Sequence, residues 1–238
     1  SNGVVCIMPP STPRETADSV VVGLRIRPLL SRDLAEGARE CLRKVAGEPQ
    51  VVLGADRAFT FNHVFDPKAT QGEIFDGCIR PIIESVLDGY NATILAYGQT
   101  GSGKTHTMGS SYSEEAAAGE DAGLIPRAIA HLFEIAGANP ESSVSATATF
   151  IEIYKEEVHD LLTWKENAEG GGSLATLAIR ENAEGGGLTL TGQQSKEVKS
   201  VEDAMGVLAD GARNRATGAT AMNATSSRSH AIFTICLL

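Results

Sequence analysis

Residues 98–105 read Gly98-Gln99-Thr100-Gly101-Ser102-Gly103-Lys104-Thr105 and fit the pattern GxxxxGK[ST]. Glycines in this pattern let backbone N–H groups wrap closely around phosphate oxygens. Lys104 is placed to reach the β- and γ-phosphates, and the hydroxyl of Thr105 is placed to ligate Mg²⁺. The stretch therefore predicts a binding site for a magnesium nucleotide.

The residues on both sides give this loop the context that such a loop needs. Thr93–Tyr97 is an apolar, β-branched run that leads straight into Gly98, and a helix is expected from about Lys104. A glycine-rich turn of this composition would match the pattern by chance in about one of a hundred shuffled sequences. A strand before the loop and a helix after it make chance less frequent still, so we favour nucleotide binding.

Strands and helices alternate along the rest of the chain. Apolar periodicity predicts strands at 20–26, 51–53, 59–64, 144–154 and 230–238. It predicts helices at 71–87, with Pro81 kinking or restarting the helix, and at 125–136 and 201–215. Surface turns are expected at 110–121 and at the two NAEGGG copies, 167–172 and 182–187, which flank a small hairpin. This order predicts an α/β P-loop NTPase with a central mixed β-sheet and helices on both faces.

The composition narrows the class of protein further. The chain has 238 residues, of which 42% are hydrophobic and 21% charged, enough for one substantial core and too apolar for global disorder. A net charge of −10 disfavours nucleic acid as a partner. Residues 1–17 are polar and proline-bearing, so we expect a flexible leader, and no apolar run is long enough to predict a membrane helix. The four scattered cysteines favour reduced thiols in the cytoplasm over zinc or disulfides.

Other motifs follow in a fixed order. Arg25-Ile-Arg27-Pro28 ends the first predicted strand, and the later motifs are AYGQTGSGKTHTM at 96–108, IEIYKEE at 151–157, DLL at 160–162 and NATSSRSH at 223–230. Together they resemble the kinesin motor domain, from about residue 20 to the last residue. The residues at 47–50, 65–67, 89–93 and 123–127 look most like the kinesin-4 (chromokinesin-like) branch. The resemblance implies an ATP-dependent microtubule motor domain that hydrolyses Mg-ATP.

The resemblance also implies which residues hold the nucleotide. Arg25 and Pro28 would flank the adenine of ATP or ADP, and His106 would close its other side; an arginine suits the face of a purine. Two solvated arginines at a strand end are the plain alternative. The full implied set of nucleotide-binding residues is Arg25, Arg27, Pro28, Gly98, Gln99, Thr100, Gly101, Ser102, Gly103, Lys104, Thr105 and His106.

Residues 223–230 match the loop called switch I in this family. By the resemblance, Asn223 would help hold the attacking water and Ser226 would lie close to the γ-phosphate. Ser227 would join Thr105 as a magnesium ligand, whereas His230 receives no catalytic role. Arg228 would pair with a glutamate of the switch II motif DxxGxE. The implied catalytic set is Lys104, Asn223, Ser226 and Arg228.

The motif DxxGxE does not occur in these 238 residues. We therefore expect residues 18–238 to be the N-terminal part of a motor domain, truncated before switch II, which follows the leader of residues 1–17. Two alternatives to a motor stay open. The first is a nucleotide-binding but catalytically incomplete microtubule-binding module. The second is another P-loop enzyme such as a GTPase, which the lack of an NKxD motif disfavours.

The implied partner is the acidic microtubule, which a chain of net charge −10 must meet with a local basic patch. The candidates surround the NAEGGG turns and are Lys165, Arg180, Lys196 and Lys199. Interleaved glutamates make a solvated loop an equal alternative. No sustained heptads occur, so a homodimer would need a coiled coil outside this chain. The implied location is the microtubule cytoskeleton of the cytoplasm, including the spindle or cilium.

Overall fold

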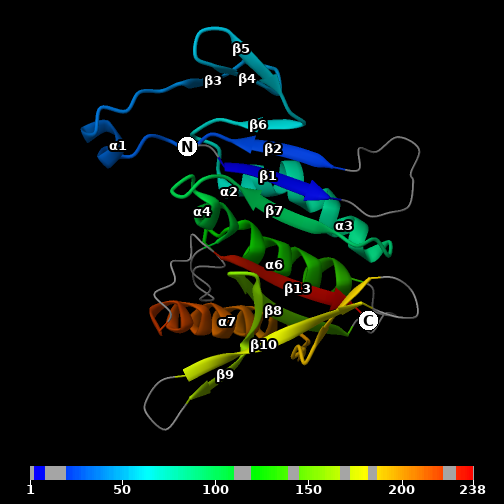
Figure 1. Cartoon of the computed structure of the whole chain (residues 1–238). Coiled ribbons are helices and arrows are strands. Elements are labelled where there is room, and N and C mark those ends of the chain that lie inside the picture. The colour runs from blue at the N-terminus through cyan, green and yellow to red at the C-terminus, as the bar shows by residue number, and fades with distance from the viewer. Residues whose placement is uncertain are drawn as a thin grey trace. The chain divides into compact units, whose positions relative to one another are not determined.

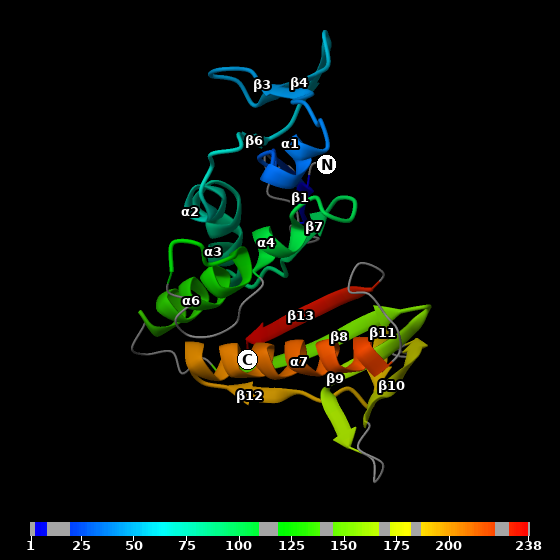
Figure 2. The same cartoon turned by 90° about the vertical axis from the view of Figure 1, so that its left-hand side faces the viewer.

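The computed structural model describes residues 3–8, 20–109, 119–138, 145–166, 172–181, 187–221 and 229–237. Two compact units make up the chain, one of residues 1–111 with 115–136 and one of residues 112–114 with 137–238. Their elements are shown in two views in Figures 1 and 2. Among the described residues, none of the helices is long and apolar enough to cross a membrane.

The first unit is built on a four-stranded mixed sheet with the order β6-β2-β1-β7 (Figure 1). The strands are β1 (Gly3–Met8), β2 (Val21–Arg25), β6 (His63–Phe65) and β7 (Thr93–Tyr97). β2 is parallel to β6 and antiparallel to β1, and β1 is also antiparallel to β7. β2 and β7 therefore run in the same direction, and both end at the same edge of the sheet. This edge carries the Arg27-Pro28 segment and the loop of residues 98–103.

The leader differs from the expectation of a flexible segment. Gly3–Met8 forms β1, which pairs with Val21–Arg25 on one side and with Thr93–Tyr97 on the other. Valine and isoleucine in this run favour extended backbone, and two neighbouring strands supply its hydrogen-bond partners. The polar residues that suggested a flexible leader lie outside the part of the chain that the structure describes.

A small antiparallel sheet with the order β3-β4-β5 extends the first unit. Its strands are β3 (Leu42–Lys44), β4 (Gln50–Leu53) and β5 (Arg57–Thr60), and α1 (Ser31–Ala35) precedes them. Val51 of β4 packs with Leu24, Ile26 and Val64 in one buried cluster, which joins this sheet to β2 and β6. The strand predicted at 51–53 is confirmed, and the one predicted at 59–64 is divided between β5 and β6.

The helix predicted at 71–87 is present in three pieces. They are α2 (Gln71–Ile74), the π-helical turn η1 (Phe75–Ile79) and α3 (Arg80–Leu87). Pro81 lies in the first turn of α3, directly after the π-helical turn, so the predicted restart at Pro81 is confirmed. Among the described residues, this unit also contains α4 (Lys104–Met108) and α6 (Leu124–Gly137).

The second unit is a six-stranded sheet with the order β11-β10-β9-β8-β12, in which β13 pairs with β8. The strands are β8 (Ala146–Tyr154), β9 (Glu157–Glu166), β10 (Gly172–Glu181), β11 (Leu188–Thr191), β12 (Lys196–Val198) and β13 (His230–Leu237). α7 (Val201–Ala221) lies along this sheet (Figure 2). Asp160, which is fully buried, accepts hydrogen bonds from Leu162 N at 2.9 Å and Gln194 N at 2.6 Å, which explains the aspartate of the DLL motif.

The mixed sheet of the first unit, the antiparallel sheets and the helices together confirm the predicted α/β fold class. The strands expected at 20–26, 144–154 and 230–238 are present, and the helix expected at 201–215 continues to Ala221. The loop expected at 110–121 and the NAEGGG turns lie mostly outside the described residues.

Candidate nucleotide-binding site

The loop of residues 98–103 connects β7 to α4, as the sequence predicts. Gly101 and Gly103 have φ angles of +80° and +97°, a region that side chains with a Cβ adopt at a cost. Ser102 N donates to Gln99 O at 3.1 Å, and this bond closes a turn within the loop. Gly103 is the N-cap of α4, so the chain passes directly from the last glycine into the helix. The local sequence thus builds the tight turn that phosphate binding needs.

Lys104 folds back over the loop. Its Nζ donates to Gly98 O at 2.6 Å and to Gln99 O at 3.0 Å. These bonds hold the positive charge at the loop instead of extending it into solvent. The side chains of Thr105 and His106 are exposed on the first turn of α4. An exposed hydroxyl beside a phosphate loop fits Mg²⁺, which takes few protein ligands and completes its shell with phosphate oxygens and water.

Arg25, at the end of β2, lies in a partly buried network. Its Nη1 donates to Gln71 Oε1 at 2.8 Å and to Thr107 Oγ1 at 2.9 Å, and its Nη2 donates to Ala69 O at 3.4 Å. Gln71 Nε2 in turn donates to His106 O at 2.6 Å. Burial lowers the pKa of Arg25 from its ordinary value. The network joins the end of β2 and the start of α2 to the helix that follows the phosphate loop.

Arg27 lies against the phosphate loop. A Cβ added to Gly103 would lie 3.9 Å from Arg27 Cδ. Arg27 Nη2 is 2.8 Å from Asp33 Oδ2, which also accepts a hydrogen bond from Leu30 N at 2.8 Å. The bond from Leu30 N, and then the neighbouring Arg27, lower the pKa of Asp33 below its ordinary value. Asp33 therefore stays ionised at neutral pH and holds Arg27 beside the loop.

The buried Nε and Nη1 of Arg27 and the buried Oγ of Ser102 have no hydrogen-bond partner within the described residues. Such groups are unusual in a folded protein and point to polar ligands at the loop. Pro28 is exposed next to Arg27. The structure thus brings together the Arg27-Pro28 segment and residues 98–106, which are most of the predicted nucleotide-binding set.

A close contact between two glycines fixes the end of α4. Gly109 has a φ of +120°, and a Cβ on Gly123 would lie 2.3 Å from Gly109 N. Only glycine at position 123 permits this approach. The contact holds the end of the loop-bearing helix against the first turn of α6.

Sequence reasoning missed several residues that support the site. Gln71, Thr107 and Asp33 were not among the predicted residues, although each contacts one that was. One signal was present for Gln71, because Thr70 and Glu73 match the capping-box pattern, and Gln71 follows the N-cap Thr70. The structure then gives it a buried side chain.

Most of the predicted switch I segment, residues 223–230, lies outside the part of the chain that the structure describes. Asn223, Ser226, Ser227 and Arg228 lie outside the described residues. Their roles stay predictions from the resemblance. Within the described part of the chain, no group of three or more His, Cys, Asp or Glu side chains could hold a metal ion.

The predicted basic residues of the second unit do not gather in one patch. Lys165 pairs with Ser173 at one end of β10, whereas Arg180 lies at the other end, about 20 Å away at the rise of an extended strand. Lys196 Nζ lies 3.6 Å from Asp210 Oδ2, and Lys199 Nζ lies 3.3 Å from Glu197 Oε1. Their positive charges are therefore partly neutralised.

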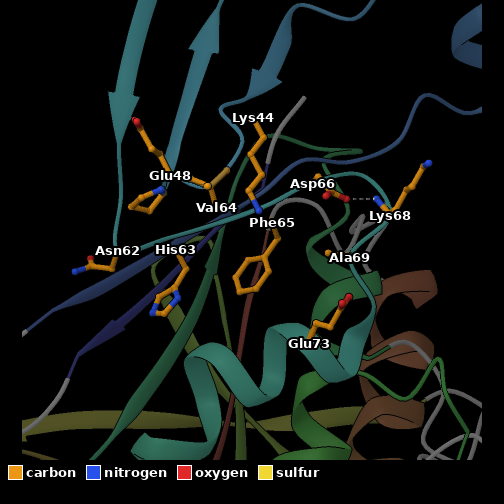
Figure 3. Close-up of a pocket in the computed structure, with 12 residues that line it drawn as sticks. Lys44, Glu48, Asn62, His63, Val64, Phe65, Asp66, Lys68, Ala69 and Glu73 are labelled. Carbon is orange, nitrogen blue, oxygen red and sulfur yellow. Dashed lines mark hydrogen bonds between the residues drawn. The ribbon is translucent and has the colours of Figure 1, made fainter.

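A separate pocket of about 470 Å³ lies on the first unit, between the β3–β5 sheet and α2 (Figure 3). The rings of His63 and Phe65 lie nearly parallel in it, with centroids 6.1 Å apart, and Lys44 points toward Phe65. Residues of the phosphate loop do not line this pocket. Figure 3 also shows that Asp66 turns back to cap the N–H of Lys68, at 2.8 Å.

Comparisons with known proteins agree on one family. The family model described as "Kinesin motor domain" matches residues 25–238. The kinesin-like protein KIF27 of Rattus norvegicus is 43% identical over 216 residues, which are 91% of this chain and 15% of the relative. The chromosome-associated kinesin KIF4 of Mus musculus is 43% identical over 216 residues, covering 91% of this chain and 17% of the relative. The kinesin-like protein KIF21B of Homo sapiens is 45% identical over 227 residues, covering 91% of this chain and 14% of the relative.

One solved structure extends the likeness to the fold. It is described as "Structure of a fast kinesin: Implications for ATPase mechanism and interactions with microtubules". It superposes with a TM-score of 0.76 at 30% identity and covers 90% of this chain and 58% of that chain. The chain therefore spans less than a fifth of the curated relatives and over half of the solved chain. Similar identities to KIF27, KIF4 and KIF21B do not single out the kinesin-4 branch.

Proposed function

The chain belongs to the kinesin motor domain family, and on this premise we propose that it is part of an ATP-dependent microtubule motor. In this proposal, hydrolysis of Mg-ATP is coupled to microtubule binding and movement. The observation that supports it most strongly is the loop between β7 and α4, in which Lys104 Nζ is held by Gly98 O and Gln99 O. A cation fixed at a glycine loop suits the β- and γ-phosphates.

In the proposed reaction, water attacks the γ-phosphorus of ATP and the β–γ phosphoanhydride bond breaks. The products are ADP and inorganic phosphate. Backbone N–H groups of residues 98–103 bind the phosphates, and Lys104 exchanges its carbonyl partners for phosphate oxygens. Thr105 and Ser227 would hold Mg²⁺, which neutralises phosphate charge when bound. Catalysis of this kind acts by positioning and by charge stabilisation. Within switch I, we assign Asn223 to the water, Ser226 to the γ-phosphate and Arg228 to a switch II glutamate.

The adenine is proposed to lie by Arg25 and Pro28, with His106 closing its other side, and Arg27 belongs to the same proposed nucleotide-binding set. The exposure of Pro28 and His106 and the contact of Arg27 with Gly103 support this placement. The bonds of Arg25 to Gln71 and Thr107 hold its side chain beside α4.

The finer statements are proposals as well. We assign residues 18–238 to the N-terminal part of the motor domain and favour the kinesin-4 branch, which the residues at 47–50 and 123–127 support. We also propose that microtubules stimulate the ATPase, and that tubulin is contacted by Lys165, Arg180, Lys196 and Lys199. A homodimer would form through a coiled coil outside the chain. The proposed location is on cytoplasmic microtubules, including those of the spindle or cilium.

A catalytically incomplete microtubule-binding module is the second candidate. It would bind nucleotide tightly without turnover.

Replacement of Lys104 by alanine tests the phosphate site. We expect Lys104→Ala to weaken Mg-ATP binding at least tenfold, because a charge-assisted contact to phosphate contributes about 1.5–3 kcal/mol. Titration with a fluorescent ATP analogue measures the affinity. Lys199→Ala is the control, since Lys199 is an exposed lysine on the other unit. Equal affinities of Lys104→Ala and the unchanged protein would contradict the site, and tighter binding of GTP than of ATP would contradict the ATPase assignment.

A further inference from the structure

A second, partly buried polar cluster lies in the second unit and contains none of the predicted site residues. It joins the middle of β8, the second half of α7 and the residue before β13. Glu152 is buried on β8, with 6% of its surface exposed. Its Oε1 accepts hydrogen bonds from Arg215 Nε at 2.7 Å and from Ser229 Oγ at 2.5 Å. Arg215 Nη2 also donates to Ser229 Oγ at 2.9 Å and to Ser229 O at 3.4 Å.

The hydroxyl of Ser229 closes this cluster. It donates to the carboxylate and accepts from the guanidinium, so both of its hydrogen-bonding roles are used within one triangle. A buried carboxylate needs such partners, because it would otherwise be desolvated without compensation. The direct bond between Arg215 and Glu152 remains when the hydroxyl is removed. The serine is therefore not needed to neutralise the buried charge, and its contribution is to fix its own backbone.

Ser229 lies directly after the segment to which the proposed function assigns catalytic roles, so holding its backbone in place also affects that segment. Ser229 directly follows Arg228 and directly precedes β13, whose Ala231 pairs with Glu152 itself. On the other side, Arg215 belongs to α7, which ends at Ala221. The cluster thus ties the two elements that border residues 222–228, the stretch to which the proposed function assigns the catalytic water and a magnesium ligand.

We propose that Glu152, Arg215 and Ser229 form a clamp of positioning residues, which fixes the chain at Ser229, directly after residues 222–228, and thereby sets the catalytic step of the proposed hydrolysis. None of the three touches the nucleotide in this proposal. The inference rests on the proposed function for its catalytic consequence, whereas the fixation of Ser229 stands on the geometry alone.

The first test is the rate at which trypsin cleaves the Arg228–Ser229 bond of the full-length protein under native conditions, measured by mass spectrometry of the new N-terminus at Ser229. We expect Ser229→Ala to raise this rate about fivefold, the population shift that loss of one hydrogen bond of ordinary strength produces. Ser229→Thr keeps the hydroxyl and is expected to restore the slow rate. Thr234→Ala removes a hydroxyl from an exposed position of the same strand and is the control. Equal rates for Ser229→Ala and Thr234→Ala would overturn the clamp.

The second test separates positioning from folding. We expect Ser229→Ala to lower kcat for ATP severalfold with little change in KM, and Ser229→Thr to restore kcat. A thermal unfolding curve equal to that of Thr234→Ala would show that the loss is not one of folding. A kcat equal to that of the unchanged protein would overturn the positioning role. If the unchanged protein has no turnover, the proposed function fails, and the proteolysis rates still decide on the clamp.

Discussion

Cys78 shows how burial controls the chemistry of a single residue. It lies on η1 with 3% of its surface exposed, whereas Cys41 and Cys236 are exposed. Burial raises the pKa of the Cys78 thiol to about 11. The thiol therefore stays protonated at pH 8, where an ordinary cysteine is partly thiolate.

We expect Cys78 to react with iodoacetamide about two hundredfold more slowly than an unperturbed thiol at pH 8, from the thiolate fractions alone. Peptide mass spectrometry measures the rates for Cys78, Cys41 and Cys236 in one sample. Between the ordinary thiol pKa of about 8.5 and the raised value, the unfolded thiol loses its proton while the folded one keeps it. Stability should therefore fall as pH rises through this range, and less so in Cys78→Ala. Labelling of Cys78 as fast as Cys41 would contradict its burial.

Gln71 connects Arg25 to the loop-bearing helix, in addition to the direct bond from Arg25 to Thr107. We expect Gln71→Leu to lower the free energy of unfolding by about 2 kcal/mol, because Arg25 Nη1 and His106 O lose a buried partner. Chemical denaturation measures the change. Gln50→Leu, which removes an exposed bond to Thr60, is the control and should cost less than about 0.5 kcal/mol. Equal costs for the two variants would contradict the network.

Among the elements, α7 carries Gly206 and Gly211 in opposite surroundings. A Cβ at Gly211 would lie 2.2 Å from Phe150 Cδ1 on β8, whereas nothing lies within 4 Å of a Cβ at Gly206. The helix approaches the sheet closely at the first position and leaves open space at the second. Both glycines lower the intrinsic helix propensity, so only Gly211 has a packing reason to be present.

We expect Gly206→Ala to raise the free energy of unfolding by up to about 1 kcal/mol, the helix propensity difference between glycine and alanine. Gly211→Ala should lower it by about 1–3 kcal/mol, because the aromatic ring of Phe150 must move. Denaturant unfolding of the two variants measures both changes. The same sign for both would contradict the packing of α7 on β8.

At the scale of elements, local patterns predicted much of the fold. The strand at 93–97 matches β7 residue for residue, because the apolar run ends where the glycine loop begins. The helix at 71–87 was predicted with a kink or restart at Pro81, but periodicity could not show the π-helical turn before it. Side-chain contacts between elements, such as that of Gln71 with Arg25, and the contact of Asp33 with Arg27 could not be predicted, since no repeating local pattern records them. The strand at Gly3–Met8 was missed because the surrounding polar residues dominated the composition of the leader.

For the whole molecule, the net charge limits how the chain can bind an acidic partner. A chain of net charge −10 is repelled by an acidic polymer unless positive groups face it locally. Of the four candidate residues, Lys196 and Lys199 lie beside acids, and Lys165 of β9 and Arg180 of β10 lie at opposite ends of the β9–β10 pair. Electrostatic attraction to tubulin through these residues should therefore be weak and strongly reduced by salt.

The most direct test of the motor assignment is ATP turnover by the full-length protein with and without taxane-stabilised microtubules, at low ionic strength. We expect severalfold stimulation by microtubules, which Lys104→Ala abolishes. Unchanged turnover when microtubules are added, in protein shown to bind Mg-ATP, would contradict it.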